Sequence, residues 1–546
     1  MLSRTLFASV ILAACAPAIP PPSPWFNPGT AHPAAAPAST AGPGAAVVGS
    51  TPPTVAAAQG LLRIDGASTS CTSIVSVQPD GSAALLCTFE RERACGIRQL
   101  GPDGEERSRS ELVPGRCMQW VPRGDGGGFL LTLSEDDRSS TIAVLDNAGK
   151  LVVSTALTSK GGVAPTGARL ALDGGLIVAL QYNSNLVFRG KQLGTTKYTV
   201  AGIIKLPPSL DRLAWSKLFD TRLTMIAALL PATHGGVDAI TNTRGPLVPG
   251  APVNPPLNAD GSFGGETYGW RSERVVFDAG GNPAARTDLA FPAAERPMTA
   301  VQVDDSVAAL TPSTEHYGFA NLTTLRPDGQ RDRIALGNAR RFEATTNGAP
   351  WIIDNDLKTA KQPIINWTAR EIGGDHRKLA LVTVLAKQRV NWVSIAAQGD
   401  RVVAFGNSSD PSTGIQTTVT ALAALSNSAS TLDPARLSVL DRIVLNPACR
   451  VARSALDSPA QPVNLTPFYP ALGACGLPVD AHAYLELFSE GGIKALTIVR
   501  GANANANAKA TACARQVLEP VFACPPPNRN IMLPLQPPAA PVPRQR

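Results

Sequence analysis

The pattern of apolar and polar positions from residue 61 onward is one of short apolar runs separated by glycine, aspartate and asparagine. Runs such as Ile142–Leu145 and Leu151–Val153 have the length and composition of strands, and the 3.6-residue spacing of amphipathic helices is nearly absent. Asp-Gly and similar pairs before these runs are typical of tight turns between antiparallel strands. The pattern therefore predicts an all-β fold assembled from hairpins.

A turn followed by an apolar run recurs about every 50 residues along the chain. These turns lie at Asp80-Gly81, Asp125-Gly126, Asp173-Gly174, His234-Gly235, Asp304-Asp305, Asn347-Gly348 and Gly399-Asp400. Several repeats contain a second turn, at Pro102–Gly104, Asp146–Gly149, Asp278–Gly281 and Pro327–Gly329. Two hairpins make four strands, and four-stranded sheets repeated in a ring are the blades of a β-propeller. We therefore predict a β-propeller of seven four-stranded blades, or eight if the run after Gly491-Gly492 is another blade.

Two β-sandwiches are the structural alternative, because they also contain short strands and Gly/Asp turns. The nearly continuous apolar runs favour the propeller, in which neighbouring blades cover both faces of each sheet. Ile203–Leu206 is followed by Asp211–Phe219, which contains the sequence Trp-Ser-Lys. This segment resembles the strand–turn–Trp-Ser-Lys–strand phrase of bacterial secreted propeller repeats, and the resemblance implies the same fold for the body of the chain.

The first fifteen residues have the organisation of an export signal. Arg4 is positively charged, Thr5–Ile11 is apolar, and small residues follow, as in a secretory signal peptide. Leu12–Cys15, with the sequence Leu-Ala-Ala-Cys, resembles the lipobox of bacterial lipoproteins. The resemblance implies that residues 1–14 are removed and that Cys15 becomes the lipidated first residue, with Ala16 favouring the outer membrane. The alternative is an ordinary secretory signal whose last residues happen to include a cysteine.

The segments that flank the body have a different composition. Residues 15–58 are rich in proline and alanine and carry almost no charge, and residues 525–546 have the same character. Such sequence buries too little apolar surface to fold and acts as an extended tether. The blades are therefore expected within residues 59–440, and residues 441–524 are expected to form a disulfide-containing last blade or cap.

Composition and charge exclude several classes of protein. Hydrophobic residues make up 44% of the 546 residues, which is enough for a sizeable core and too much for a wholly disordered chain. The chain contains 48 glycines and 48 prolines, which excludes a coiled coil. The net charge of +7 is spread along the sequence, and we therefore expect no nucleic-acid partner.

The cysteine count predicts a disulfide framework. Eight of the nine cysteines remain after Cys15: Cys71, Cys87, Cys95, Cys117, Cys449, Cys475, Cys513 and Cys524. An even number in an exported protein predicts four disulfides, two in each cluster, with the late pair fastening the last blade. Cys71 and Cys117 lie at similar distances before their turns, so Cys71–Cys117 with Cys87–Cys95 is the preferred early pairing over Cys71–Cys87. The late cluster allows three connectivities. No Cys or His spacing fits a metal site.

Catalytic motifs are missing from the sequence. The five histidines are scattered, and there is no H-E-x-x-H, G-x-S-x-G or P-loop pattern. His316, Asp354 and Asp356 could converge in a ring, although exposure at strand ends is the simpler explanation. Tryptophans are expected to pack between blades, with an aromatic ligand platform as the alternative: Trp120, Trp215, Trp270, Trp351, Trp367 and Trp392. We therefore expect no catalytic residues, no cofactor and no metal.

Two classes of function remain. The first is a non-enzymatic, membrane-anchored lipoprotein of the cell envelope that serves as a protein-interaction or scaffold platform. It is comparable in plan to the propeller lipoproteins of outer-membrane assembly complexes, and its partners are the membrane, through the lipid anchor, and an envelope or surface protein. The second is a propeller enzyme or carbohydrate-binding protein with a site in the central channel. The sparse histidines and charged residues favour the first class.

Overall fold

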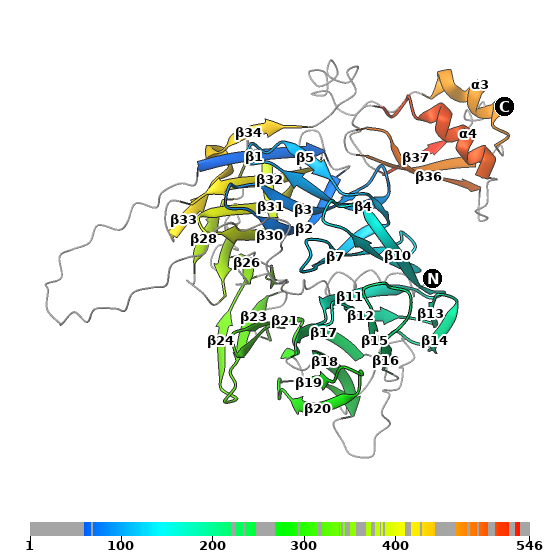
Figure 1. The fold of residues 1–546 in the computed structure, drawn as a ribbon. Coiled ribbons are helices and arrows are strands. Elements are labelled where there is room, and N and C mark those ends of the chain that lie inside the picture. The colour runs from blue at the N-terminus through cyan, green and yellow to red at the C-terminus, as the bar shows by residue number, and fades with distance from the viewer. Residues whose placement is uncertain are drawn as a thin grey trace, which may run out of the picture.

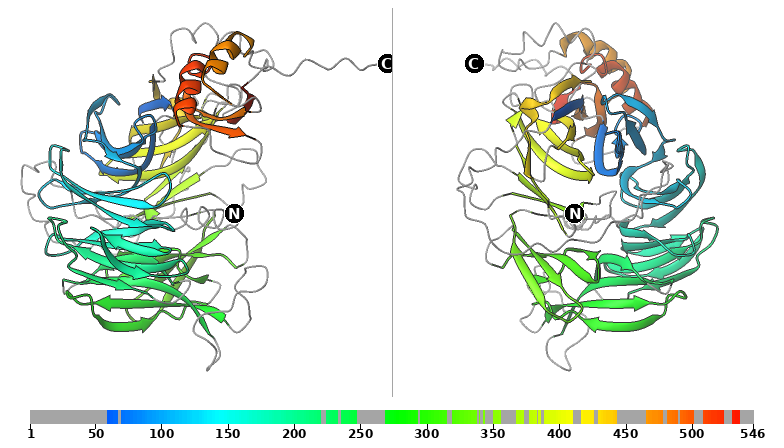
Figure 2. Two further views of the ribbon diagram at one scale, coloured as in Figure 1. Left: turned by 90° about the vertical axis from the view of Figure 1, so that its right-hand side faces the viewer. Right: turned by 60° about the vertical axis from the view of Figure 1, so that its left-hand side comes forward.

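The computed structural model describes residues 59–535 with gaps, the longest being 247–267, 356–366 and 443–464, and does not describe residues 1–58 or 536–546. Strands dominate the described part, where seven sheets of four to six strands follow one another along the chain. Figure 1 shows the sheets in chain order, and the right-hand view of Figure 2 shows them arranged around a ring. The structure confirms the predicted β-propeller. We number these sheets as blades 1 to 7 in chain order.

Blades 1 to 3 are formed by residues 69–218. Blade 1 contains β2 (Thr69–Val77), β3 (Ala83–Phe89), β4 (Ala94–Leu100) and β5 (Glu106–Arg109), with β6 (Val113–Pro114) beside β4. Blade 2 contains β7 (Arg116–Pro122), β8 (Gly128–Leu133), β9 (Ser139–Leu145) and β10 (Leu151–Ser159). Blade 3 contains β11 (Val163–Leu170), β12 (Leu176–Tyr182), β15 (Val200–Leu206) and β16 (Trp215–Leu218). The hairpin β13 (Asn185–Phe188) and β14 (Lys191–Thr195) leaves blade 3 and extends the edge of blade 2.

Blades 4 to 7 complete the ring. Blade 4 contains β17 (Thr224–Pro231), β18 (Val237–Pro246), β19 (Tyr268–Phe277) and β20 (Pro283–Asp288). Blade 5 contains β21 (Thr299–Val303), β22 (Ser306–Pro312), β23 (Ala320–Leu325) and β24 (Arg331–Ala335). Blade 6 contains β25 (Phe342–Glu343), β26 (Trp351–Asn355), β27 (Trp367–Glu371), β28 (Lys378–Leu381) and β33 (Ala429–Leu432). Blade 7 contains β29 (Val384–Leu385), β30 (Gln388–Gln398), β31 (Arg401–Ser409), β32 (Gln416–Ala424), β1 (Gln59–Gly66) and β34 (Ser438–Asp441), with a short 3₁₀ turn, η3 (Pro434–Arg436), before β34.

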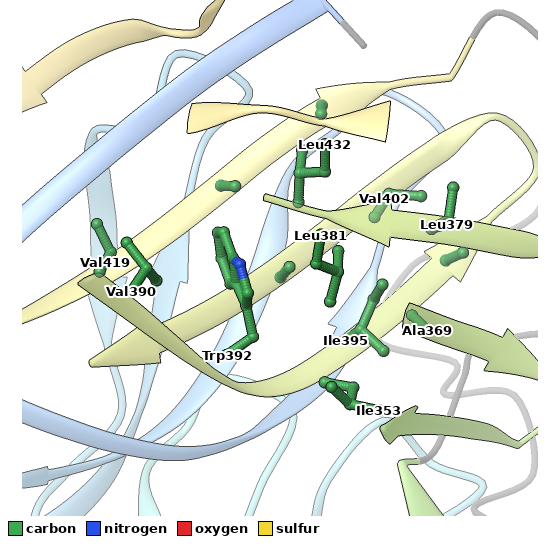
Figure 3. Close-up of a cluster of buried hydrophobic side chains, with 14 of the residues drawn as sticks. Ile353, Ala369, Leu379, Leu381, Val390, Trp392, Ile395, Val402, Val419 and Leu432 are labelled. Carbon is green, nitrogen blue, oxygen red and sulfur yellow. The ribbon is translucent and has the colours of Figure 1, made fainter. Parts of the chain in front are cut away.

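The innermost strands of the blades make a closed circuit of contacts. Each of β2, β7, β11, β17, β21, β25 and β30 contacts the next, and β30 contacts β2. Apolar side chains fill the space between adjacent blades, as in the cluster that joins blades 6 and 7 (Figure 3). There, Trp392 and Ile395 of β30 pack against Leu381 and Ile353 of blade 6, and all four are at least nine-tenths buried. The apolar runs of the sequence are continuous because both faces of each sheet are covered.

The recurrent Asp-Gly turns connect the first and second strands of their blades. The glycines at 81, 126 and 174 have φ of 90°, 88° and 77°, a region that favours glycine. In the same turns, the Asp80 carboxylate accepts the Ser82 N–H at 2.8 Å, and Asp173 accepts the Gly175 N–H at 3.1 Å. The second set of turns connects third and fourth strands. The local sequence therefore determines where each hairpin reverses.

The ring is closed by the first strand of the body. β1 pairs antiparallel with β32, from Gln59 opposite Ala424 to Gly66 opposite Thr417, and parallel with β34 on its other edge. The N-terminal strand thus completes blade 7, the last blade in the chain. Contrary to the expectation for the late cysteines, the Cys475–Cys513 bridge does not fasten this blade but lies in a separate unit; Cys449 and Cys524 lie outside the described residues.

A buried cluster of charges connects β1 to blade 1. The carboxylate of Asp65 accepts hydrogen bonds from Arg63 at 2.8 and 2.9 Å and from Arg98 of β4 at 2.9 and 3.0 Å. These three residues are only 3–6% exposed. Arg98 also donates to Glu106 at 2.7 Å, and Arg63 donates to the Gly104 carbonyl at 2.5 Å. The cluster therefore joins the last blade of the ring to the first.

The C-terminal residues form a small unit of helices and strands. This C-terminal unit contains η5 (Thr466–Phe468), α3 (Tyr469–Ala474), β35 (Ala481–Leu487), β36 (Ile493–Arg500), α4 (Ala508–Leu518) and β37 (Asn530–Pro534). Its sheet has the order β36-β35-β37 and buries its own apolar cluster, which includes Leu472, Leu485 and Leu518. The run after Gly491-Gly492 is β36 of this sheet and therefore does not belong to an eighth blade.

Candidate functional site

The two ends of the blades differ in their connections. Strands alternate in direction, so the first-to-second and third-to-fourth turns lie at one end of each blade. We call this end the turn face, and in the described residues it includes 78–82, 123–127, 171–175 and 326–330. The opposite end, the loop face, carries the remaining connections. Its described members include 90–93, 134–138, 160–162 and 183–199.

The loop face carries the longest connection among the described residues of the propeller, which joins β12 to β15. Residues 183–199 include the β13–β14 hairpin, which pairs with β10 of the neighbouring blade. The connection between β18 and β19 spans residues 247–267 and lies outside the described residues. A hairpin that projects from one face of a rigid scaffold is a common position for binding residues.

The C-terminal unit contacts the loop face at blade 1. Lys494 of β36 lies 3.1 Å from Glu90 in the β3–β4 connection and 3.1 Å from Glu486 of β35. Burial by itself would lower the pKa of Lys494, but hydrogen bonds to Glu486 and Glu90 raise it above its usual value. The Arg91 guanidinium lies 4.9 Å from the centre of the Phe488 ring and donates to the Gly491 carbonyl at 3.3 Å. These contacts hold the unit beside the loops of the first blade.

A cavity lies against the innermost strands of blades 3, 4 and 5. β-Bulges interrupt the pairing of two of these strands, and the unpaired residues, Thr166 of β11 and Ala227 of β17, line the cavity. Such bulges bend a strand and redirect its side chains, which separates the strands at this point. Arg169 and Gln302 supply charge and polarity to the wall.

Among the described residues, Arg169 is the only charged one in the wall of this cavity. Its guanidinium is half-buried, and within the described part of the chain no hydrogen bond or ion pair reaches it. Burial lowers the pKa of Arg169 to about 10. The backbone beside it is fixed, because the buried Gln119 of β7 donates to the Ala168 carbonyl at 3.0 Å. The arrangement can bind an anion, and the described wall residues include no nucleophile with an adjacent base.

The structure corrects the preferred pairing of the early cysteines. The bridges are Cys71–Cys87 and Cys95–Cys117, in place of Cys71–Cys117 with Cys87–Cys95. Cys71 of β2 lies directly opposite Cys87 of β3, so strand register decides the first bridge. The second bridge joins β4 of blade 1 to β7 of blade 2. A third, Cys475–Cys513, joins α3 to α4 in the C-terminal unit.

Most of the other residues singled out in the sequence lie outside the described part of the structure. Cys15, Cys449, Cys524, His316 and Asp356 lie outside the described residues. Asp354 is buried in β26, 3.4 Å from Arg370 on the neighbouring strand. Within the described residues, no group of three His, Cys, Asp or Glu side chains could hold a metal ion, and no helix is long and apolar enough to cross a membrane.

The tryptophans mostly serve the packing between strands and blades. Trp120, Trp351 and Trp392 are at least nine-tenths buried. Trp215 stacks on Phe277 with 6.4 Å between ring centres, and its indole N–H donates to the Ala279 carbonyl at 3.0 Å. The Trp-Ser-Lys segment is therefore an outer strand of blade 3 that contacts blade 4. Sequence reasoning missed Arg169, because a single arginine between Ala168 and Leu170 gives no local signal.

Comparisons with known proteins give remote structural similarity. No family model matches the chain, and no curated protein matches it. The β-propeller domain of the trilobed protease from Pyrococcus furiosus is 8% identical, with a TM-score of 0.38 over 64% of this chain and 94% of that chain. A prolyl endopeptidase gives 10% identity and a TM-score of 0.33 over 63% of this chain and 46% of its own. A lignostilbene dioxygenase from Pseudomonas brassicacearum is 12% identical, with a TM-score of 0.34 over 55% of this chain and 69% of that chain. These values carry no argument about activity.

Proposed function

We propose that the protein is a lipid-anchored, non-catalytic protein of the bacterial cell envelope that binds an envelope or surface protein through the loop face of its propeller. The observation that supports this function is the asymmetry of the two faces. The turn face consists of hairpin turns and the connection 207–214, whereas the loop face carries the β13–β14 hairpin and contacts the C-terminal unit. Loops on a rigid scaffold are a common location for binding residues.

Three disulfides support a location outside the cytoplasm, because such bonds form and persist in oxidising compartments. The lipobox-like Leu12–Cys15 supports a lipid anchor at Cys15, and several acyl chains together give stable membrane attachment. The proline-rich residues 15–58 would then separate the ring from the membrane surface. An extended tether of this composition spans about 3 Å per residue, or on the order of 100 Å in total.

Site-specific photo-crosslinking on the full-length protein in cells tests this function. A photoreactive residue is placed at Glu135 or Lys160 on the loop face, and at Lys150 or Gln330 on the turn face as matched controls; all four positions are exposed. We expect the loop-face positions to capture a discrete protein and the turn-face positions to capture none. Capture from the turn face alone, or from neither face, would contradict the proposal.

Two further measurements separate this function from the enzymatic alternative. The purified full-length protein is assayed for hydrolase and dehydrogenase turnover, and none is expected. Membrane fractionation of the Cys15→Ser variant is expected to show release of the protein or retention of the uncut precursor. Reproducible turnover that is lost on substitution of residues in the channel wall would favour an enzyme and refute the proposed scaffold role.

A further inference from the structure

The cavity between blades 3, 4 and 5 contains polar groups that the described protein leaves unsatisfied. The Arg169 guanidinium lies in its wall without a hydrogen bond or ion pair from any described residue. The Thr166 hydroxyl is buried and has no partner, and the residue is only 7% exposed. Gln302 donates to the Asp304 carbonyl at 2.7 Å, which fixes its orientation and leaves its Oε1 buried without a donor. The Thr166 hydroxyl and Gln302 Oε1 are thus two buried polar atoms without a partner in one wall, which is uncommon because buried polar groups are nearly always paired.

An arginine in this setting costs folding free energy. Taking a guanidinium partly out of water without a compensating charge disfavours its charged form. Burial alone lowers the pKa of Arg169 to about 10, so no carboxylate offsets the loss of hydration. A methionine or leucine at 169 would match the apolar neighbours Ile226 and Leu229 and would avoid this cost. The position is therefore poorly explained by stability.

We propose that this cavity is a binding site for a small aliphatic carboxylate, whose negative charge pairs with Arg169. A guanidinium and a carboxylate match in shape and form two parallel hydrogen bonds. One guanidinium neutralises the single charge of a carboxylate, whereas a phosphate would leave a second charge uncompensated in a partly buried site. The carbon chain of the ligand would contact the apolar wall formed by Ile226, Leu229 and Ala300.

The dimensions of the cavity favour a small ligand. The space open to the centres of water-sized groups is about 20 Å³, and one water needs roughly 10–15 Å³ by the same measure. A carboxylate head with a short chain toward the open side fits this space better than a sugar. Gly167 also lines the cavity, and a Cβ at this position would meet no atom within 4 Å. The glycine leaves open space directly beside Arg169.

Binding is tested on the full-length protein by isothermal titration calorimetry and thermal unfolding, at constant ionic strength. The probes are acetate and butyrate, with butyramide and inorganic phosphate as comparisons. We expect saturable binding and a rise in Tm with at least one carboxylate, and neither effect with butyramide or phosphate. Absence of saturable carboxylate binding up to 50 mM, or equal binding of phosphate, would overturn the proposal.

Two variants and a control assign binding to this cavity. Arg169→Met is expected to weaken carboxylate binding at least tenfold and to raise the Tm of the ligand-free protein, because an unpaired partly buried charge is removed. Gly167→Val is expected to fill the open space and to weaken binding to a similar extent while the charge remains. Arg212→Gln, which changes an exposed arginine of blade 3, should leave binding unchanged.

Each result of the variants bears on the proposal. A fall in the Tm of ligand-free Arg169→Met would show that Arg169 serves the fold, and would refute a role in binding. Unchanged carboxylate affinity in both Arg169→Met and Gly167→Val would place any binding elsewhere. These measurements use the purified protein and small ligands, so their outcome does not depend on whether the loop face captures a partner protein. The binding site is therefore tested independently of the proposed scaffold function.

Discussion

Replacement of Asp65 by asparagine is expected to destabilise the closed ring by about 3 kcal/mol. The Asp65 carboxylate is 6% exposed and receives four hydrogen bonds of 2.8–3.0 Å from Arg63 and Arg98. Two unit charges 4 Å apart attract by about 4 kcal/mol at an effective dielectric constant of about 20. Removal of one member of a buried pair costs about 3–5 kcal/mol, because a buried charge stays behind.

The lower end of that range applies here. Arg98 keeps its hydrogen bond to Glu106, and Arg63 keeps the Gly104 carbonyl, so neither guanidinium loses every partner. An exposed pair provides the matched control: Asp103 lies 2.5 Å from Arg107, and both side chains are about half exposed. Asp103→Asn is therefore expected to cost less than about 1 kcal/mol, as is usual for surface pairs.

Unfolding in guanidinium chloride, followed by tryptophan fluorescence, measures the free energy of unfolding of both variants. Six of the seven tryptophans lie in strands of the propeller, so the signal reports on the ring. The wild type and the two variants are compared at pH 7 through their transition midpoints and slopes. If Asp65→Asn costs no more than Asp103→Asn, the cluster does not hold blades 7 and 1 together, and the reasoning fails.

The stability lost in Asp65→Asn should also depend on pH. Burial by itself would raise the pKa of Asp65, but hydrogen bonds from Arg63 and the charge of Arg98 outweigh it and hold the pKa below its usual value. A carboxyl with a lowered pKa in the folded state stabilises the protein above its unfolded pKa of about 3.9. That stability is lost as the pH falls through the lower, folded pKa. The difference in free energy of unfolding between the wild type and Asp65→Asn should therefore shrink below about pH 4.

Three further predictions concern the anchor, the C-terminal unit and ring closure. Mass spectrometry of the mature wild type should find a diacylglycerol-modified Cys15 at the N-terminus; an unmodified residue would contradict lipidation. Joint replacement of Cys475 and Cys513 by serine should destabilise the C-terminal unit by about 2–4 kcal/mol and leave the propeller transition in place, because the bridge joins only α3 and α4; hydrogen exchange resolves the two parts, and a shifted propeller transition would contradict it. Deletion of residues 59–66 should open blade 7 and produce oligomers in size-exclusion chromatography, because β32 would expose an unpaired edge; a stable monomer would contradict this result.

The sequence predicted the features that depend on local chemistry. Asp-Gly pairs such as Asp80-Gly81 determine turns by themselves, through a positive φ at glycine and an aspartate carboxylate that accepts the N–H two residues further on. Repetition of these turns then predicted a propeller. Ala510, Ala514 and Leu518 of α4 are apolar at the four-residue spacing of a helix, so this helix also has a local signal in the sequence.

Long-range pairing explains what the sequence did not predict. Disulfide partners follow strand register, and the similar spacing of Cys71 and Cys117 before their turns was no guide to the strand opposite each cysteine. β1 was expected within the blades, but nothing in Gln59–Gly66 identifies β32 as its partner. Arg169 acquires its setting only when β11, β17 and β21 meet around the ring.

The pairing of β1 with β32 dictates an order of events during folding. β1 is the first strand of the body to leave the ribosome, and its partner ends at Ala424, after all other strands of the ring except β33 and β34. Contacts across such sequence separations form slowly, so the other blades can stack before the ring closes. Throughout that interval β1 remains an unpaired edge, open to association with another chain. Ring closure is therefore a late folding step, and a truncated chain that lacks β32 cannot complete it.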